Sequence, residues 1–410
     1  MAEERTHTVE TEAPEDQAQA GAQTAGTEAP EDQAQAEARA EAHGPREDES
    51  KGESPAPDRA WQQEEKPELS DEERLQGLPR EQLRQMMWDM LLARRFEEKA
   101  AESYALGKIG GFCHLYIGQE AVATGAIHAL RKDDYVMTAY REHAHALQVG
   151  ISPGAVMAEL YGRADGCSKG KGGSMHMFSA EHNYLGGHGI VGGQIPLALG
   201  VAWKIKYRQE DRVMQVYCGE AAVNQGAFHE SLNMAALWKL PLVLIVENNR
   251  FGMGTAWERA ASLYDIWQKA SAYAMPSAVA DGMDVLDMYR VAKEAHDRAR
   301  RGEGPTLIEA RTYRFVGHSM SDPVSGVYRT KEDVEAEKAK DPIRIYADLL
   351  ARAGILQQDE LEKMDEEVKK ISEEAAEFAE KSPEPDVAEL YTEIYANENV
   401  NGRLYFDGRR

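Results

Sequence analysis

Two short apolar runs with one helical segment between them constrain the fold of this chain more than any other feature. Residues 212–218 and 242–246 are apolar and of strand length, and residues 224–240 between them have a helical pattern. Parallel strands need a crossover connection, so this order predicts a βαβ unit within a parallel sheet that has helices on both faces. Residues 306–310 are a further run of strand length. We therefore expect an α/β fold.

Helix signals lie on both sides of this α/β region. Ser70 and Glu73 have the spacing of a capping box, which starts a helix. The amphipathic helix expected to follow has an apolar face formed by Leu83, Met87, Met90 and Leu91. Near the other end, apolar residues recur every three or four positions, which favours a helix packed on its own domain over an extended coiled coil. These residues are Leu361, Met364, Val368, Ile371, Ala375 and Phe378.

The first 70 residues differ from the rest of the chain in composition. They hold 19 acidic and 6 basic side chains, and the first 60 contain no Phe, Trp or Tyr, so we expect disorder. A ten-residue repeat at 11–20 and 27–36 is too short and polar for a solenoid. The tail is expected to act as a solubilising segment or as a docking arm. The predicted organisation is a disordered acidic tail at 1–70, an α/β domain at 71–345 and a packed helical extension at 346–410.

Composition and charge exclude several classes of function. The formal net charge is −24, whereas nucleic-acid binding needs clustered Lys and Arg, so we expect no nucleic-acid partner. Cys113, Cys167 and Cys218 are too few and too unevenly spaced for a disulfide framework or a metal finger. The longest apolar run, residues 240–246, is too short to span a membrane. The first residues lack the regions of a secretory signal, so we expect a cytoplasmic protein.

Two loops after the predicted strands carry residues suited to a metal and a phosphate. Residues 219–226 follow the first strand and residues 247–252 follow the second. In a parallel sheet such loops lie beside each other, where ligands bind. Glu220 and Asn249 can both offer oxygens to Mg²⁺, and the small residues after Glu220 let backbone amides approach a phosphate. An acid at a strand end is also a common helix cap, so these residues alone leave both interpretations open.

A wider set of motifs gives these loops a family context. The two loops resemble the thiamine-diphosphate motif, a Gly-Asp-Gly followed at a fixed distance by Asn-Asn. Further segments occur at residues 110–116, 138–141, 169–177, 189–192, 233–241 and 317–323. Together, over roughly residues 75–400, they resemble the alpha subunits of the thiamine-diphosphate-dependent 2-oxoacid dehydrogenases, and among these the pyruvate dehydrogenase (acetyl-transferring) component.

The resemblance implies a cofactor, a metal and the residues that bind them. Thiamine diphosphate would be bound through Mg²⁺, which Glu220, Asn249 and the carbonyl of Phe251 would hold. The residues that would surround the cofactor are Tyr140, Arg141, Gly189, Val191, Gly219, Glu220, Ala221, Ala222, Asn249, Phe251, Gly252 and His318.

Two histidines are the implied catalytic residues. His114 lies in the segment that the family uses near the substrate and the lipoyl group, where it would donate or relay a proton. His318, together with Arg141, suits the diphosphate end of the cofactor because both side chains can donate charge-assisted hydrogen bonds.

The chain departs from the family pattern at one loop. It has Gly219-Glu220-Ala221 where most pyruvate members have Gly-Asp-Gly. The branched-chain relatives use Glu at this position, so metal binding by Glu220 remains plausible. A β-carbon at Ala221 costs energy if the backbone there has positive φ. We therefore expect either an altered diphosphate loop or a conformation that Ala tolerates.

Two polar segments have less specific interpretations. Residues 169–173 are rich in Gly and Lys but lack the spacing of a P-loop, so we expect a loop over the cofactor cleft or a plain turn. Residues 317–331 resemble the family's mobile loop, which orders on cofactor binding and is phosphorylated in some members. It contains Ser319, Ser321 and Ser325.

One residue that thiamine chemistry needs has no candidate in this chain. In this family the Glu that contacts the aminopyrimidine ring belongs to a beta subunit, and we see no second thiamine-type α/β domain. We therefore expect an α₂β₂ heterotetramer that is inactive without its beta subunit. The implied reaction is oxidative decarboxylation of pyruvate, with the acetyl group passed to a lipoyl group of the complex's acyltransferase. The alternatives are a branched-chain 2-oxoacid or acetoin dehydrogenase, and a catalytically silent scaffold.

Overall fold

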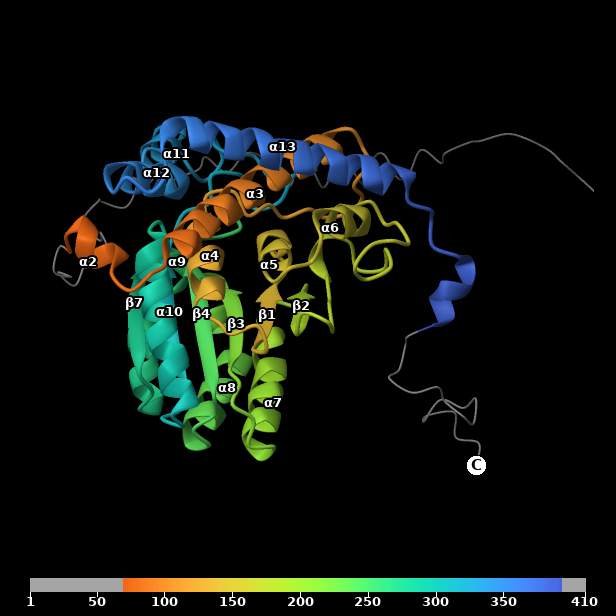
Figure 1. The fold of residues 1–410 in the computed structure, drawn as a ribbon. Coiled ribbons are helices and arrows are strands. Elements are labelled where there is room, and N and C mark those ends of the chain that lie inside the picture. The colour runs from red at the N-terminus through yellow and green to blue at the C-terminus, as the bar shows by residue number, and fades with distance from the viewer. Residues whose placement is uncertain (1–68, 393–410) are drawn as a thin grey trace, which may run out of the picture. The chain divides into compact units, whose positions relative to one another are not determined.

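A six-stranded parallel sheet forms the centre of the computed structural model, which describes residues 69–392 (Figure 1). All neighbouring strands of this sheet run parallel. Their spatial order is β2 (Tyr184–His188), β1 (Tyr135–Ala139), β3 (Met214–Gly219), β4 (Leu242–Asn248), β8 (Thr306–Arg311) and β7 (Ser277–Asp281). The strands predicted at 212–218, 242–246 and 306–310 are β3, β4 and β8, so the predicted α/β class is confirmed.

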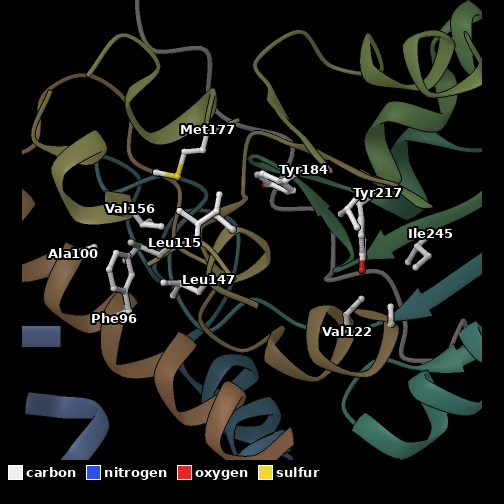
Figure 2. Packing of buried hydrophobic residues seen from close by; sticks show 14 of the residues in the cluster. Phe96, Ala100, Leu115, Val122, Leu147, Val156, Met177, Tyr184, Tyr217 and Ile245 are labelled. Carbon is white, nitrogen blue, oxygen red and sulfur yellow. The ribbon is translucent and has the colours of Figure 1, made fainter. Parts of the chain in front are cut away.

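Helices cover both faces of this sheet. On one face lie α7 (Gln194–Tyr207) and α8 (Gly226–Leu237), and on the other α4 (Glu120–His128) and α10 (Val285–Arg300). Strand β4 is buried throughout because its side chains alternate between the two layers. Leu244 and Val246 pack with α7 and α8, whereas Ile245 packs with α4 and α10. Figure 2 shows part of the layer on the α4 and α10 face, with Ile245 near Val122 of α4.

The helix predicted at 224–240 is shorter than its pattern suggested. Residues 220–224 form a five-residue 3-10 turn, η3 (Glu220–Asn224), and α8 begins only at Gly226. Gln225 between them has φ −73° and ψ 140°, an extended conformation that breaks the helix. The backbone amides after Glu220 therefore belong to a tight turn and not to the first turn of α8.

A further layer of helices packs beside the sheet. It includes α3 (Arg80–Ala105), α12 (Pro342–Arg352) and α13 (Gln358–Lys381), and Figure 1 shows α13 running alongside α3. The predicted apolar face of α3 is confirmed, since Leu83, Met87, Met90 and Leu91 are all buried. Helix α13 packs against α3 and α6 (Pro153–Leu160), which confirms a helix packed on its own domain.

The capping box at Ser70 is present but starts only a short helix. Both reciprocal hydrogen bonds between Ser70 and Glu73 form, and they cap α2 (Asp71–Leu75). The helical backbone is then interrupted before α3 begins, by Gly77, with φ +81°, and by Pro79. The expected single helix is therefore two helices.

The other elements are short and connect these layers. They are α5 (His143–Gln148), η2 (Gly173–Met175), β5 (Phe251–Gly252), β6 (Thr255–Ala256), α9 (Trp257–Ala260), η4 (Ile266–Tyr273), α11 (Lys331–Lys338) and η5 (Val387–Tyr391). Over residues 69–392, the three cysteines are free thiols. Within the same range, no helix has the length and apolar character needed to cross a bilayer. The predictions for residues 1–68 and 393–410 lie outside the described residues, and the division at 345 stays a prediction.

Candidate functional site

Three neighbouring strands of the sheet end at one cleft. Tyr140 and Arg141 follow β1, Glu220 follows β3, and Asn249 follows β4. The cleft has an empty volume of about 520 Å³, which includes space open to solvent. Its lining residues are Gln119, Ala139, Tyr140, Arg141, Val191, Gly192, Gln194, Gly219, Glu220, Ala221, Ala222, Glu247, Asn249, Phe251, Gly252, Arg314 and His318.

The structure brings together all but two of the residues predicted for the cofactor and the chemistry. Gly189 follows β2 and its backbone N–H donates to Nε2 of His176 (3.3 Å), so it lies outside the lining. His114 also lies outside the lining, but its ring packs against two residues of the cleft. The ring centroids are 4.5 Å from Tyr140 and 5.2 Å from His318. Their roles in binding and catalysis stay predictions.

Glu220 is a buried carboxyl group with one unsatisfied oxygen. Its Oε2 accepts a long hydrogen bond from the backbone N–H of Asn249 (3.4 Å), whereas its Oε1 is buried without a partner. Burial raises the pKa of Glu220, because the charged form loses its hydration. A cation at this position would replace that hydration. The carboxyl group of Glu220 is therefore suited to bind a cation.

Two buried guanidinium groups supply positive charge to the same cleft. Arg141 donates to the carbonyl oxygens of Leu115 (2.5 Å) and His318 (2.7 Å). Arg314 donates to Oδ1 of Asn249 (3.4 Å), and burial followed by the charge of Arg141 lowers the pKa of Arg314 to about 10. The carboxyl groups of Glu220 and Glu247 interact with these charges, and burial raises the pKa of both. Two desolvated positive charges therefore favour an anionic ligand.

Several residues that line the cleft were not predicted from the sequence. Arg314 lies three residues beyond β8, and its position after a strand was the only available signal. Gln119 accepts from Nδ2 of Asn249 (3.0 Å), and its own Nε2 is buried without a partner. Glu247 is bonded by the hydroxyl of Tyr116, and burial raises the pKa of Glu247 to about 7. Glu247 was predicted to begin the loop after the second strand, but β4 extends to Asn248 and Glu247 lies inside it.

The surroundings of His114 and His318 favour the neutral form of both imidazoles. Burial, followed by the charge of Arg141, lowers the pKa of His114 to about 2 and that of His318 to about 3. The Nδ1 atoms of both rings are buried without a hydrogen-bond partner. A bound anion would raise both pKa values, since it stabilises the imidazolium. Both rings are therefore suited to gain or lose a proton when a ligand changes the local charge.

Known proteins are similar to this chain over most of its length. The model of the dehydrogenase E1 component family matches residues 88–388. The pyruvate dehydrogenase E1 component subunit alpha of Rhizobium meliloti is 51% identical over 307 residues, which are 75% of this chain and 88% of that protein. The protein of the same name from Zymomonas mobilis is 49% identical over 318 residues, which are 77% of this chain and 89% of that protein. This chain belongs to the dehydrogenase E1 component family.

The Glu220-Ala221 departure leaves the backbone of this E1 chain unstrained. Ala221 is not among the residues with positive φ. Of the two outcomes expected for this loop, the structure has the conformation that Ala tolerates. The neighbouring Gly252 has a different reason to be glycine, because a β-carbon there would lie 2.6 Å from the β-carbon of Ala221.

The backbone of the Gly-rich loop in this E1 chain surrounds a side chain from α6. The carboxyl group of Glu159 on α6 accepts four backbone N–H groups: Ser168 (2.8 Å), Gly170 (2.9 Å), Gly172 (2.7 Å) and Gly173 (3.0 Å). A β-carbon on Gly172 would lie 1.9 Å from the carbonyl oxygen of His176. The amides that a P-loop offers to phosphate are therefore already occupied, as expected from the spacing.

The segment predicted to be the mobile loop is held by several contacts in this structure. Arg329 donates to the carbonyl oxygens of Arg314 (2.7 Å) and Val316 (2.7 Å). The backbone N–H of Met320 donates to the carbonyl of Cys113 (2.9 Å). The loop that carries His318 is thereby attached to the segment that carries His114.

Proposed function

We propose that this chain is the alpha subunit of a thiamine-diphosphate-dependent pyruvate dehydrogenase (acetyl-transferring), which oxidatively decarboxylates pyruvate. The observation that carries the proposal is the cleft at the strand ends. It combines two buried guanidinium groups, Arg141 and Arg314, with the buried Oε1 of Glu220, which has no hydrogen-bond partner. The relatives at 45–51% identity, each named pyruvate dehydrogenase E1 component subunit alpha, support the choice of substrate.

The donor set fits thiamine diphosphate and Mg²⁺. Arg141 and Arg314 would bind the diphosphate, and oxygens of Glu220, Asn249 and Phe251 would hold the metal. In the part of the chain that the structure describes, no cluster of three His, Cys, Asp or Glu side chains is suited to a metal. This agrees with Mg²⁺, which typically takes one or two carboxylates together with phosphate oxygens and water. We include Mg²⁺ in the proposal on this basis.

The protein's own groups then position the reactants and manage protons. Bound thiamine diphosphate supplies the carbon nucleophile that adds to a 2-oxoacid and the electron sink for loss of CO₂. Tyr140 and Phe251 line the cleft and would contact the bound cofactor. His114 and His318, neutral and without partners at Nδ1, would accept and return protons as charge develops in the cleft.

A partner subunit would complete the site beside an exposed apolar face. On α7 and the loop before it, Ile190, Val191, Leu197, Trp203 and Tyr207 are all exposed. Val191 also lines the cleft, so this face is continuous with the site. Large exposed apolar patches mark interaction surfaces. We propose that the beta subunit of an α₂β₂ heterotetramer covers this face and supplies the missing Glu, and that the lipoyl-bearing acyltransferase receives the acetyl group.

The decisive experiment combines this chain with candidate beta subunits, thiamine diphosphate and Mg²⁺. Pyruvate, 3-methyl-2-oxobutanoate and acetoin are compared as substrates, because Glu220 is also found in the branched-chain branch. We expect pyruvate to react fastest and no turnover without a beta subunit. Turnover by this chain alone would refute the shared site, and silence with every beta subunit would favour a scaffold.

The partner face has its own test. Leu197→Glu places a charge on this face and should prevent co-elution with the beta subunit on size exclusion. Leu106→Glu, on an exposed residue beyond the end of α3, is the matched control and should leave the assembly intact. Assembly that tolerates Leu197→Glu would move the interface to another face of the chain.

A further inference from the structure

Three buried side chains outside the cleft form a chain of hydrogen bonds. His143 Nδ1 lies 2.8 Å from Oε2 of Glu97 on α3, and His143 Nε2 lies 2.8 Å from Oγ of Ser174. The backbone N–H of His114 donates to the same Ser174 Oγ (3.3 Å). Glu97, His143 and Ser174 are all at least 95% buried. None of the functions discussed above uses these three residues.

The contacts link the three side chains to the backbone of His114. Glu97 accepts from Nδ1–H of His143, since a carboxylate only accepts. His143 Nε2 and Ser174 Oγ share a hydrogen bond, and the same Ser174 oxygen accepts the N–H of His114. Hydrogen bonds in such a series polarise one another. The series ends at the backbone of His114, a residue whose ring packs against Tyr140 and His318 of the cleft.

The position of His114 depends on its backbone hydrogen bond to Ser174, because few other contacts fix its side chain. Its Nδ1 is buried without a hydrogen-bond partner, and its ring has only packing contacts with Tyr140 and His318. Glu97 also accepts the backbone N–H of Tyr116 (2.8 Å). The backbone N–H groups of His114 and Tyr116 are therefore both bound by this series, His114 through Ser174 and Tyr116 through Glu97. The backbone thus sets where the His114 ring lies.

Ser174 is itself held by the Gly-rich loop. Gly172 and Gly173, immediately before it, donate their N–H groups to Glu159. The Gly-rich loop therefore positions the Ser174 hydroxyl, a role that its sequence did not indicate. Phe96 and Leu115, which adjoin Glu97 and His114 along the chain, belong to the packed core shown in Figure 2.

We propose that Glu97, His143 and Ser174 are a positioning relay that fixes His114 for its proton transfers, an inference that rests on the proposed function. The order hydroxyl, imidazole, carboxylate is also that of a hydrolase triad. The surroundings of Ser174 favour positioning over nucleophilic attack. Its oxygen already accepts from His114, and the side chain is buried.

A double-mutant cycle tests the relay in the complete enzyme. Ser174→Ala should lower kcat about ten-fold and leave KM for pyruvate within about two-fold, since it loosens a residue that acts during turnover. In a His114→Ala background the same change should cost less than about two-fold. An equal loss in both backgrounds, or no loss in either, overturns the relay. Ser174→Thr keeps the hydroxyl and should retain most of the activity.

A chemical readout keeps the relay separate from the proposed function. The full chain without cofactor is treated with diethylpyrocarbonate, and modification of His114 is followed by mass spectrometry. Ser174→Ala should raise the rate several-fold. Ser103→Ala, which removes another buried hydroxyl, one bonded by Tyr161 (2.9 Å), should leave it unchanged. Failure of the wild-type complex to decarboxylate pyruvate would end the proposed function, and the His114 rate would still decide the relay.

Two further outcomes complete this test. If Ser174→Ala does not fold, Glu97→Gln keeps the shape of the side chain and removes its charge. It should raise the His114 rate in the same direction but less. An unchanged His114 rate in whichever variant folds overturns the relay. Covalent capture of Ser174 by a fluorophosphonate would make it a nucleophile and would also overturn the positioning role.

Discussion

Glu220 and Glu159 are both buried carboxyl groups beside Gly-rich or small-residue loops, yet their surroundings are opposite. Glu159 accepts four backbone N–H groups, two on each oxygen. Glu220 has one long bond to Asn249 and a buried oxygen without a partner. A satisfied carboxylate holds its own chain together, whereas an unsatisfied one indicates a missing ligand. Both groups are buried glutamates beside a loop of small residues, and the hydrogen bonds and the neighbouring arginines distinguish structure from function.

The largest expected effect is on activity, at Glu220. Glu220→Ala removes the proposed metal ligand and should lower turnover on the order of 100- to 1,000-fold. Its melting temperature should stay the same or rise, because a desolvated carboxyl group is lost. Activity of the complex is measured against Mg²⁺ concentration, together with thermal unfolding. Glu220→Asp is the control and should keep turnover within about ten-fold. Unaltered Mg²⁺ dependence in Glu220→Ala would refute the metal assignment.

The second effect is on stability, at Glu159. Glu159→Gln keeps the volume but turns an NH₂ group toward amides that need an acceptor, so it should cost about 3 kcal/mol of unfolding free energy. Glu98→Gln removes an exposed pair with Arg95 and should cost less than about 0.5 kcal/mol. Denaturant titration of the full chain measures both. Equal costs would mean that the four amides do not stabilise the loop.

A third buried carboxyl group gives a pH-dependent effect. Burial raises the pKa of Glu142 to about 8, although Tyr184 and the N–H of Met177 bond to it. The folded state therefore binds this proton more tightly than the unfolded state, whose pKa is 4.5. Stability from this group is complete below pH 4.5 and is lost as pH rises towards about 8. Glu142→Gln should flatten the fall in unfolding free energy between about pH 5 and about pH 8, and Glu98→Gln should keep it.

The smallest expected effect is at Ala221. Since its φ is not positive, Ala221→Gly relieves no strain, and we expect activity within about two-fold of the parent chain. The KM for thiamine diphosphate in the complex is the sensitive measurement. A large improvement would mean that the methyl group obstructs the diphosphate after all.

Much of the fold could be read from the sequence because it depends on local patterns. The apolar runs at β3, β4 and β8 and the stripes of α3 and α13 depend only on neighbouring residues. The strand order and the break at Gln225 were not predictable, because they depend on tertiary packing and on one pair of backbone angles.

The site was partly predictable for a similar reason. Glu220 and Asn249 follow adjacent strands, so the βαβ rule brings them together. Arg314 and Gln119 reach the cleft from segments that are far apart in the sequence, which no spacing reveals. The relay residue His143 is close to Arg141 along the chain, yet its function depends on Glu97 and Ser174, which only the folded chain brings within reach.

The close approach of Ala221 and Gly252 has a consequence for how this chain can change over generations. With Ala at 221, any side chain at 252 would place two β-carbons 2.6 Å apart. The present residue at one site thus removes options at the other, and the order of substitutions matters. A lineage, or a library made in the laboratory, must first acquire Ala221→Gly before position 252 becomes free to vary.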